Sequence, residues 1–148
     1  MAMTIVELPA RGLSLELPLG SDVTCETPLL LLLPAIDGLR PWVVLTRAPT
    51  AADSLQDWVA EELARQDGTL QIPLLLAYDD CELFGLPALR TLIGHAAGEH
   101  AMTLVQWWAL LDGHGILAAA SCVTPHYHLV AAQFEQIVTT GVRFDDDR

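Results

Sequence analysis

Apolar and polar positions alternate in the first part of the chain, which predicts short β-strands there. Residues Thr4 to Leu8 and Leu13 to Leu17 follow a period of two, which places successive side chains on opposite faces of a strand. The run Leu29 to Leu33 is apolar at every position and predicts a strand that is apolar on both faces. The β-branched run Trp42 to Thr46 predicts one more strand before the pattern changes.

A helical period begins after Ser54, which is a favourable N-cap residue three positions before Asp57. The pair Asp67-Gly68 predicts the end of this helix. The residues that recur at helical spacing and form its apolar face are Leu55, Trp58, Val59 and Leu63.

Four strand-like segments follow with only short turns between them. They are Leu70 to Phe84, Ala88 to Ile93, Met102 to Leu111 and Ile116 to Val123. Connections this short join antiparallel neighbours, because parallel pairing needs a long crossover. Pro73, near the start of the first segment, lacks a backbone donor and favours a place at the edge of the sheet.

A second helix is predicted from Thr124 as N-cap and Pro125 as first helical residue to a stop at Gly141. We therefore expect one α+β domain over residues 1–144, with an acidic tail at 145–148. Its mainly antiparallel sheet, of about six to seven strands, carries helices on both faces in a three-layer α/β/α arrangement. The apolar face of the second helix contains Tyr127, Val130, Ala131, Phe134, Ile137 and Val138.

Composition narrows the class of protein. The 148 residues are 52% hydrophobic and 18% charged, which excludes intrinsic disorder. The net charge of −12 repels phosphate backbones and disfavours nucleic-acid partners. The absence of lysine excludes Schiff-base chemistry and a Walker-type phosphate-binding lysine. No apolar run reaches the roughly 20 residues of a membrane span, and no signal peptide is visible, so we expect a cytoplasmic protein without stable membrane insertion. The widely spaced Cys25, Cys81 and Cys122 suit free, shielded thiols.

The order of these elements resembles the PsbP-like fold superfamily, which includes DcrB-like and LpqN-type proteins, Mog proteins and Eag-type secretion chaperones. The likeness covers about 100 residues and rests on the order of several short segments rather than on one motif. The resemblance implies a scaffold that binds other proteins or lipids, and it brings no catalytic residue with it. The segments are Trp42 to Arg47, Ser54-Leu55 with Trp58 and Leu63, Gly85-Leu86-Pro87-Ala88, Asp112-Gly113, Leu117 to Ser121, and the closing helix around Tyr127, Phe134 and Ile137.

Candidate chemistry is sparse in this sequence. His126 and His128 lie two positions apart on a predicted helix, about 200° around its axis, so they do not converge on a metal ion with Cys122 or His114. We therefore expect no metal and no cofactor, since phosphate-binding and nucleophile-turn motifs are also missing. An enzyme built around Cys122 and His126 is the least favoured alternative, because Cys122 suits a packed strand residue.

Apolar surface is the stronger signal for function. Trp107 and Trp108 are adjacent on one predicted strand and point to opposite faces of the sheet, and the leucine run is likewise two-sided. Two helices are barely enough to cover both faces of a sheet of this size. The apolar side chains of the leucine run and the tryptophan pair are therefore either part of the core or part of a groove for a partner or a second subunit. The candidate binding surface consists of Leu29, Leu31, Leu33, Trp42, Trp107 and Trp108.

These points predict a non-enzymatic cytoplasmic binding protein. Its most concrete form is an adaptor or chaperone that shields apolar segments of a client protein, such as a secreted effector. The expected partner is that client or a second copy of the chain in a homodimer. The alternative from another class is a small-molecule or lipid carrier, which a deep apolar cavity would favour.

Overall fold

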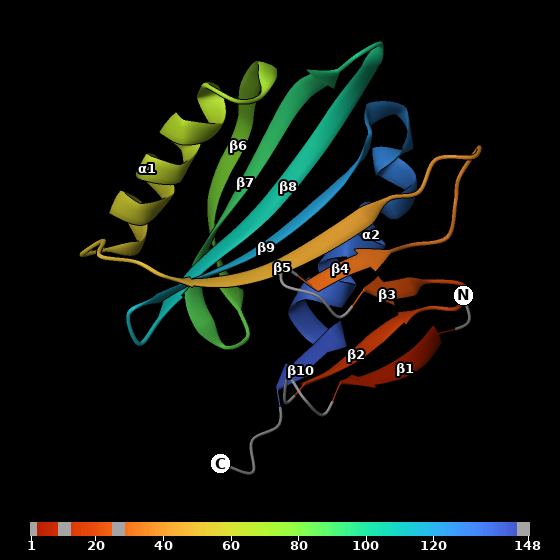
Figure 1. The fold of residues 1–148 in the computed structure, drawn as a ribbon, viewed down its shortest axis with the longest axis horizontal. Coiled ribbons are helices and arrows are strands. Elements are labelled where there is room, and N and C mark those ends of the chain that lie inside the picture. Colours follow the sequence, from red (N-terminus) through yellow and green to blue (C-terminus); the bar gives the residue numbers. More distant parts are fainter. Residues whose placement is uncertain (1–2, 9–12, 25–28, 145–148) are drawn as a thin grey trace.

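The computed structural model describes residues 3–8, 13–24 and 29–144, and a seven-stranded antiparallel sheet forms its centre (Figure 1). The strands lie side by side in the order β3-β4-β5-β9-β8-β7-β6. This confirms the predicted α+β class and the antiparallel meander. The strands of this sheet are β3 (Asp22–Thr24), β4 (Leu29–Leu32), β5 (Trp42–Pro49), β6 (Gln71–Leu83), β7 (Leu86–Ala97), β8 (His100–Leu111) and β9 (His114–Val123).

Two of the tight turns in the meander depend on glycine. Gly85 between β6 and β7 and Gly113 between β8 and β9 both have φ near +75 to +79°. A side chain at such a position meets steric strain that glycine avoids. The Gly113 turn brings β8 and β9 into continuous register, from Met102 opposite Val123 to Leu111 opposite His114.

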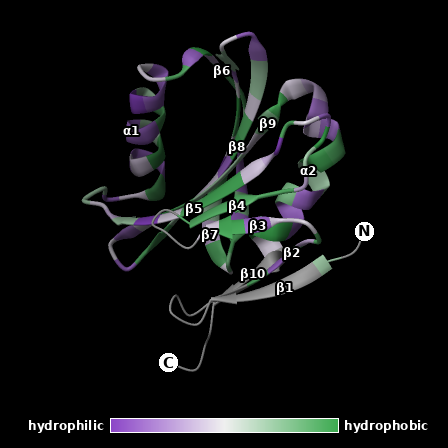
Figure 2. Cartoon of the chain, turned by 45° about the vertical axis from the view of Figure 1, so that its right-hand side comes forward, coloured by the Kyte–Doolittle hydropathy of each residue, from purple (hydrophilic) through white to green (hydrophobic). Residues whose placement is uncertain are grey.

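Helix α1 (Leu55–Asp67) covers one face of the sheet. As predicted, the Ser54 side chain caps it by accepting a hydrogen bond from the Asp57 backbone N–H at 3.1 Å. Trp58 packs edge-on against Trp108 of β8, with ring centroids 5.2 Å apart. The hydrophobic residues of α1 lie on the side facing the sheet and its hydrophilic residues face outward (Figure 2).

Helix α2 (Tyr127–Gln136) covers the opposite face, so the helices lie on both faces as predicted. It begins with a 3-10 turn, η2 (Thr124–His126), and continues into a π-helical turn, η3 (Ile137–Gly141). The prediction of Thr124 as N-cap is wrong. Its hydroxyl pairs with that of Thr103 on β8 at 3.0 Å, and the 3-10 turn has no side-chain cap.

A second, three-stranded sheet lies beside α2, and the sequence pattern did not separate it from the main sheet (Figure 1). It has the order β1-β2-β10, with β1 (Met3–Leu8), β2 (Leu13–Pro18) and β10 (Val142–Phe144). Leu15 and Leu17 of β2 are fully buried in the same core cluster as Ile137 and Val138. The N-terminal hairpin therefore supplies cover for the core that the two helices alone do not provide.

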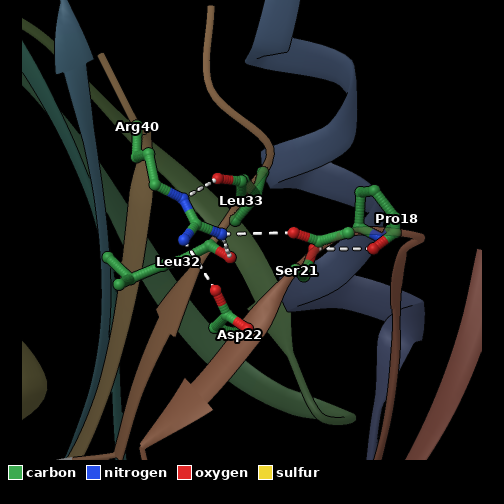
Figure 3. Close-up of polar contacts among 7 residues, drawn as sticks. Pro18, Ser21, Asp22, Leu32, Leu33 and Arg40 are labelled. Atoms are coloured by element: carbon green, nitrogen blue, oxygen red, sulfur yellow. Dashed lines mark hydrogen bonds and ion pairs between the residues drawn. The ribbon is translucent and has the colours of Figure 1, made fainter. Parts of the chain in front are cut away.

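The Arg40 side chain links the short strands β3 and β4 through hydrogen bonds and an ion pair (Figure 3). It donates hydrogen bonds to the backbone carbonyls of Leu33 at 2.7 Å, Leu32 at 3.0 Å and Gly20 at 3.2 Å. It also pairs with the Asp22 carboxylate at 2.6 Å. One guanidinium thus joins the start of β3 to the end of β4, a role that suits its planar set of donors.

Candidate functional site

The largest group of exposed apolar side chains among the described residues lies in β6, the last strand of the main sheet. We call it the β6 strip. Soluble proteins expose single apolar residues freely, but several exposed apolar residues in one strand are a candidate contact surface. The strip consists of Ile72 (83% exposed), Leu74 (62%), Leu76 (54%), Leu75 (49%) and Tyr78 (44%).

Two irregularities in β6 produce this exposure. The pairing with β7 shifts register between Gln71 and Leu74 and again between Leu75 and Ala77. Ile72 has φ of +50°, and Pro73 beside it has no backbone donor. Such β-bulges bend a strand and redirect its side chains, and they are common at sheet edges. The strip therefore lies in an irregular edge strand.

Beside the strip, α1 and β6 enclose an open groove of about 280 Å³. Its wall is mostly apolar, with the amide of Gln66 and the carboxylate of Asp67 at the helix end. The volume lies just below the roughly 300–1,000 Å³ typical of small-molecule pockets, so the groove suits a side chain of a partner better than a whole ligand. The lining residues are Leu63, Ala64, Gln66, Asp67, Leu70, Pro73, Leu75 and Ile93.

Acidic residues occupy the other half of β6. Asp79, Asp80 and Glu82 follow the strip directly and are exposed. Asp79 lies opposite Arg90 of β7, with a carboxylate oxygen 3.9 Å from the guanidinium, whereas Asp80 lies opposite the buried Leu89. The strand thus has an apolar half and an acidic half, in that order along the chain.

Arg90 anchors α2 to the sheet behind this acidic half. Its guanidinium pairs with Glu135 at 2.9 Å, donates to the Tyr127 hydroxyl at 3.2 Å and lies 5.9 Å from the centroid of the Trp107 ring. Burial, followed by the charge of Glu135, raises the pKa of the neighbouring Cys81 thiol, although Arg90 opposes the shift. This cluster holds the helix in place and leaves Cys81 protonated at neutral pH.

Five of the six residues of the predicted apolar binding surface are buried in the core. Trp42 is half-buried, and the other five side chains are no more than 2% exposed. The physical reason is that the small sheet and both helices together cover both faces of the main sheet. A partner would reach these residues only by opening the core. The five buried residues are Leu29, Leu31, Leu33, Trp107 and Trp108.

Cys122 and His126 do not form an activated pair. Cys122 lies in the core, and burial raises the pKa of its thiol to about 11, so the nucleophilic thiolate is disfavoured. His126 instead lies 3.4 Å from the Asp37 carboxylate, and His128 is exposed on α2. Within the described residues no three His, Cys, Asp or Glu side chains lie together in a way that could hold a metal ion. Cys25 lies outside the described residues.

The β6 strip was missed in the sequence because its pattern matches that of the buried leucine run. Both are unbroken apolar segments of about the same length, and neither alternates. One signal did separate them: Pro73 favoured an edge position for β6, and the structure places the strand there. Exposure then follows from having a neighbour on one side only.

The protein has an α+β fold in which an antiparallel sheet lies between two helices, with a small second sheet beside one of them. No protein-family model and no curated protein matches the sequence. The fold is nevertheless found in solved structures, and it is the PsbP-like fold, as the sequence predicted.

Three solved structures show this likeness. Cyanobacterial PsbP from Synechocystis has a TM-score of 0.65 and 9% identity, over 96% of this chain and 92% of that one. The yeast (Saccharomyces cerevisiae) Ran-binding protein Mog1p has a TM-score of 0.66 and 14% identity, over 99% and 97% of the two chains. Protein PA94 of Pseudomonas aeruginosa, of unknown function and described as a candidate regulator, has a TM-score of 0.64 and 19% identity, over 93% and 96%. At these identities the likeness establishes the fold.

Proposed function

We propose that residues 1–144 form a non-enzymatic binding domain that acts as an adaptor or chaperone. Its task is to shield an apolar segment of a client protein, and the β6 strip is the contact surface. The observation that carries this proposal is the concentration of five exposed apolar side chains in one edge strand. That Mog1p, which has the same fold, is a Ran-binding protein supports the view that the fold can present a protein-binding surface.

The strip is large enough to contribute to binding but not to complete it. Its exposed fractions add to nearly three whole side chains. At about 1.5–3 kcal/mol for each buried aliphatic or aromatic side chain, full coverage contributes about 4–9 kcal/mol. Association itself costs about 4–15 kcal/mol, so a stable complex needs further contacts from the groove, the strand backbone or nearby charges.

Two further features favour this proposal over its alternatives. The open groove is small for a lipid or cofactor, which weighs against a carrier. Cys81 and Cys122 are free, which favours the reducing cytoplasm as the location of the protein. None of the helices within the described residues is long and apolar enough to cross a membrane.

Two substitutions at equally exposed leucines test the function. Leu76 in the strip and Leu129 on α2 are both 54% exposed, so Leu76→Asp and Leu129→Asp remove the same kind of surface from two places. The probe is a fluorescein-labelled extended peptide of alternating valine and threonine, followed by fluorescence anisotropy. We expect Leu76→Asp to weaken binding at least tenfold and Leu129→Asp to change it less than twofold.

Circular dichroism and urea unfolding establish that both variants are folded before the binding comparison. Equal weakening by the two substitutions would contradict the proposal, as would a wild-type protein that does not bind the valine–threonine peptide. A client bound by the wild type and released by Leu76→Asp alone would support it.

A further inference from the structure

We propose that the β6 strip receives an extended peptide segment that runs antiparallel to β6 and carries basic residues before its apolar residues. This inference rests on the proposed function and adds the conformation, direction and charge of the bound segment. It comes from the division of β6 into two halves that offer different contacts.

The second half of β6 offers a backbone edge. From Ala77 opposite Leu92 to Leu83 opposite Leu86, β6 pairs with β7 without a register shift. No strand of the described chain pairs with the other side of β6, so its outer backbone groups have no partner within the sheet. A peptide that adds one strand to such an edge gains main-chain hydrogen bonds, a common mode of peptide recognition.

The first half of β6 offers side chains rather than a regular edge. The two register shifts interrupt its ladder, and Pro73 provides no donor. Leu74, Leu75 and Leu76 are about half exposed or more, and Leu75 also lines the groove beside α1. Apolar residues of a bound segment would cover these leucines and place one side chain in the groove.

The acidic residues fix the direction of the bound segment. Asp79, Asp80 and Glu82 lie on the second half of β6, which pairs with β7 without a register shift. Arg90 approaches one of these three carboxylates, that of Asp79. The main sheet is antiparallel at every pairing, and antiparallel pairs are the commoner kind in proteins. A segment that continues this pattern places its N-terminal residues beside the acids, where basic side chains are favoured, and its later residues beside the leucines.

The same charges disfavour a second copy of this chain as the occupant. Two copies could also pair through the second half of β6, with the two strands antiparallel. Asp79, Asp80 and Glu82 of one copy would then face the same acids of the other. Like charges directly opposite on adjacent strands are destabilising, and the chain has a net charge of −12 without a single lysine to offset them. A basic partner segment meets no such repulsion.

Two peptides of identical composition test the direction. One reads Lys-Arg-Lys-Thr-Val-Leu-Val-Leu, the other carries the same residues in reverse order, and both have blocked ends and a fluorescent label. At 0.15 M salt we expect the basic-first peptide to bind about tenfold more tightly, as a few charge pairs at a rim allow. At 1 M salt, where screening acts over about 3 Å, the preference should fall to about twofold.

A matched pair of double variants links this preference to β6. Asp80→Asn with Glu82→Gln should remove most of the preference for the basic-first peptide. Asp53→Asn with Glu61→Gln makes the same change in charge at exposed positions before and on α1 and should leave the preference intact. Leu76→Asp should weaken both peptides alike.

The outcomes separate this inference from the proposed function. Equal affinity for the two peptides, or tighter binding of the basic-last peptide, overturns the direction inferred here while the binding function stands. Failure of both peptides to bind overturns both. A wild-type dimer in sedimentation that dissociates on Leu76→Asp makes a second copy the occupant and also overturns the inference.

Discussion

Replacing Gly115 with alanine adds a single methyl group directly against the Trp58 ring of α1. A Cβ built on Gly115 would lie 2.3 Å from Cζ2 of Trp58, with two more ring atoms at 2.6 and 2.7 Å. Atoms this close must separate, and the Trp58 ring has little room, since it is 8% exposed and packed edge-on against Trp108. Moving the ring therefore disturbs the attachment of the whole helix.

The size of the effect follows from two terms. Overpacking a well-filled core costs about 1–3 kcal/mol. Disturbing an edge-to-face aromatic pair costs about 0.5–1.5 kcal/mol more. We therefore expect Gly115→Ala to lower the free energy of unfolding by about 3 kcal/mol, which for a chain of this length corresponds to a fall in Tm of roughly 10 °C.

Urea unfolding of Gly115→Ala and of a control variant measures this loss in the free energy of unfolding. Gly94 is also a strand glycine, but a Cβ there meets only Leu76 Cδ1 at an ordinary 3.5 Å, so Gly94→Ala is the matched control and should cost less than 0.5 kcal/mol. In a double-mutant cycle, Trp58→Leu should make Gly115→Ala less costly than it is alone, because the clashing ring is gone. Equal stabilities of Gly115→Ala and Gly94→Ala would refute the packing of α1 described here.

Three further predictions concern stability. Arg40→Ala should cost about 2 kcal/mol in urea unfolding, because three backbone carbonyls and a carboxylate lose a charged donor. Stability should fall as pH rises from 9.0 toward about 11, because the unfolded chain loses the Cys122 proton first; Cys122→Ala should flatten this part of the profile. Leu31→Asp should prevent folding, as judged by circular dichroism, since the side chain is fully buried. A folded Leu31→Asp variant that loses client binding would instead make the leucine run a binding surface.

Local patterns were sufficient to predict most of the fold. The cap at Ser54, the helical spacing around Trp58 and the short turns of the meander each express an interaction between residues close in sequence. The existence of each main element and the antiparallel order of β6 to β9 followed from them. Thr124 shows the limit of such reasoning, because its hydroxyl pairs with Thr103 across the sheet rather than with the adjacent helix.

The candidate site could not be predicted in the same way, because exposure is a property of tertiary contacts. Leu31 and Leu75 lie in similar apolar runs, yet Leu31 is fully buried and Leu75 is 49% exposed. The difference is that β4 has strands on both sides and core on one face, whereas β6 has one neighbour and two bulges. The local pattern also did not predict that the N-terminal strands form a separate small sheet that covers the core.

Amide hydrogen exchange along the whole chain, with and without the basic-first peptide, tests the central claim most directly. A peptide strand added to β6 forms new hydrogen bonds with backbone groups on its outer edge and slows their exchange. The account predicts protection concentrated between Ala77 and Leu83, with little change in β3, β4 or α2. Protection centred on β4 and the leucine run, or no protection in β6 despite bound peptide, would contradict the assignment of this edge as the binding surface.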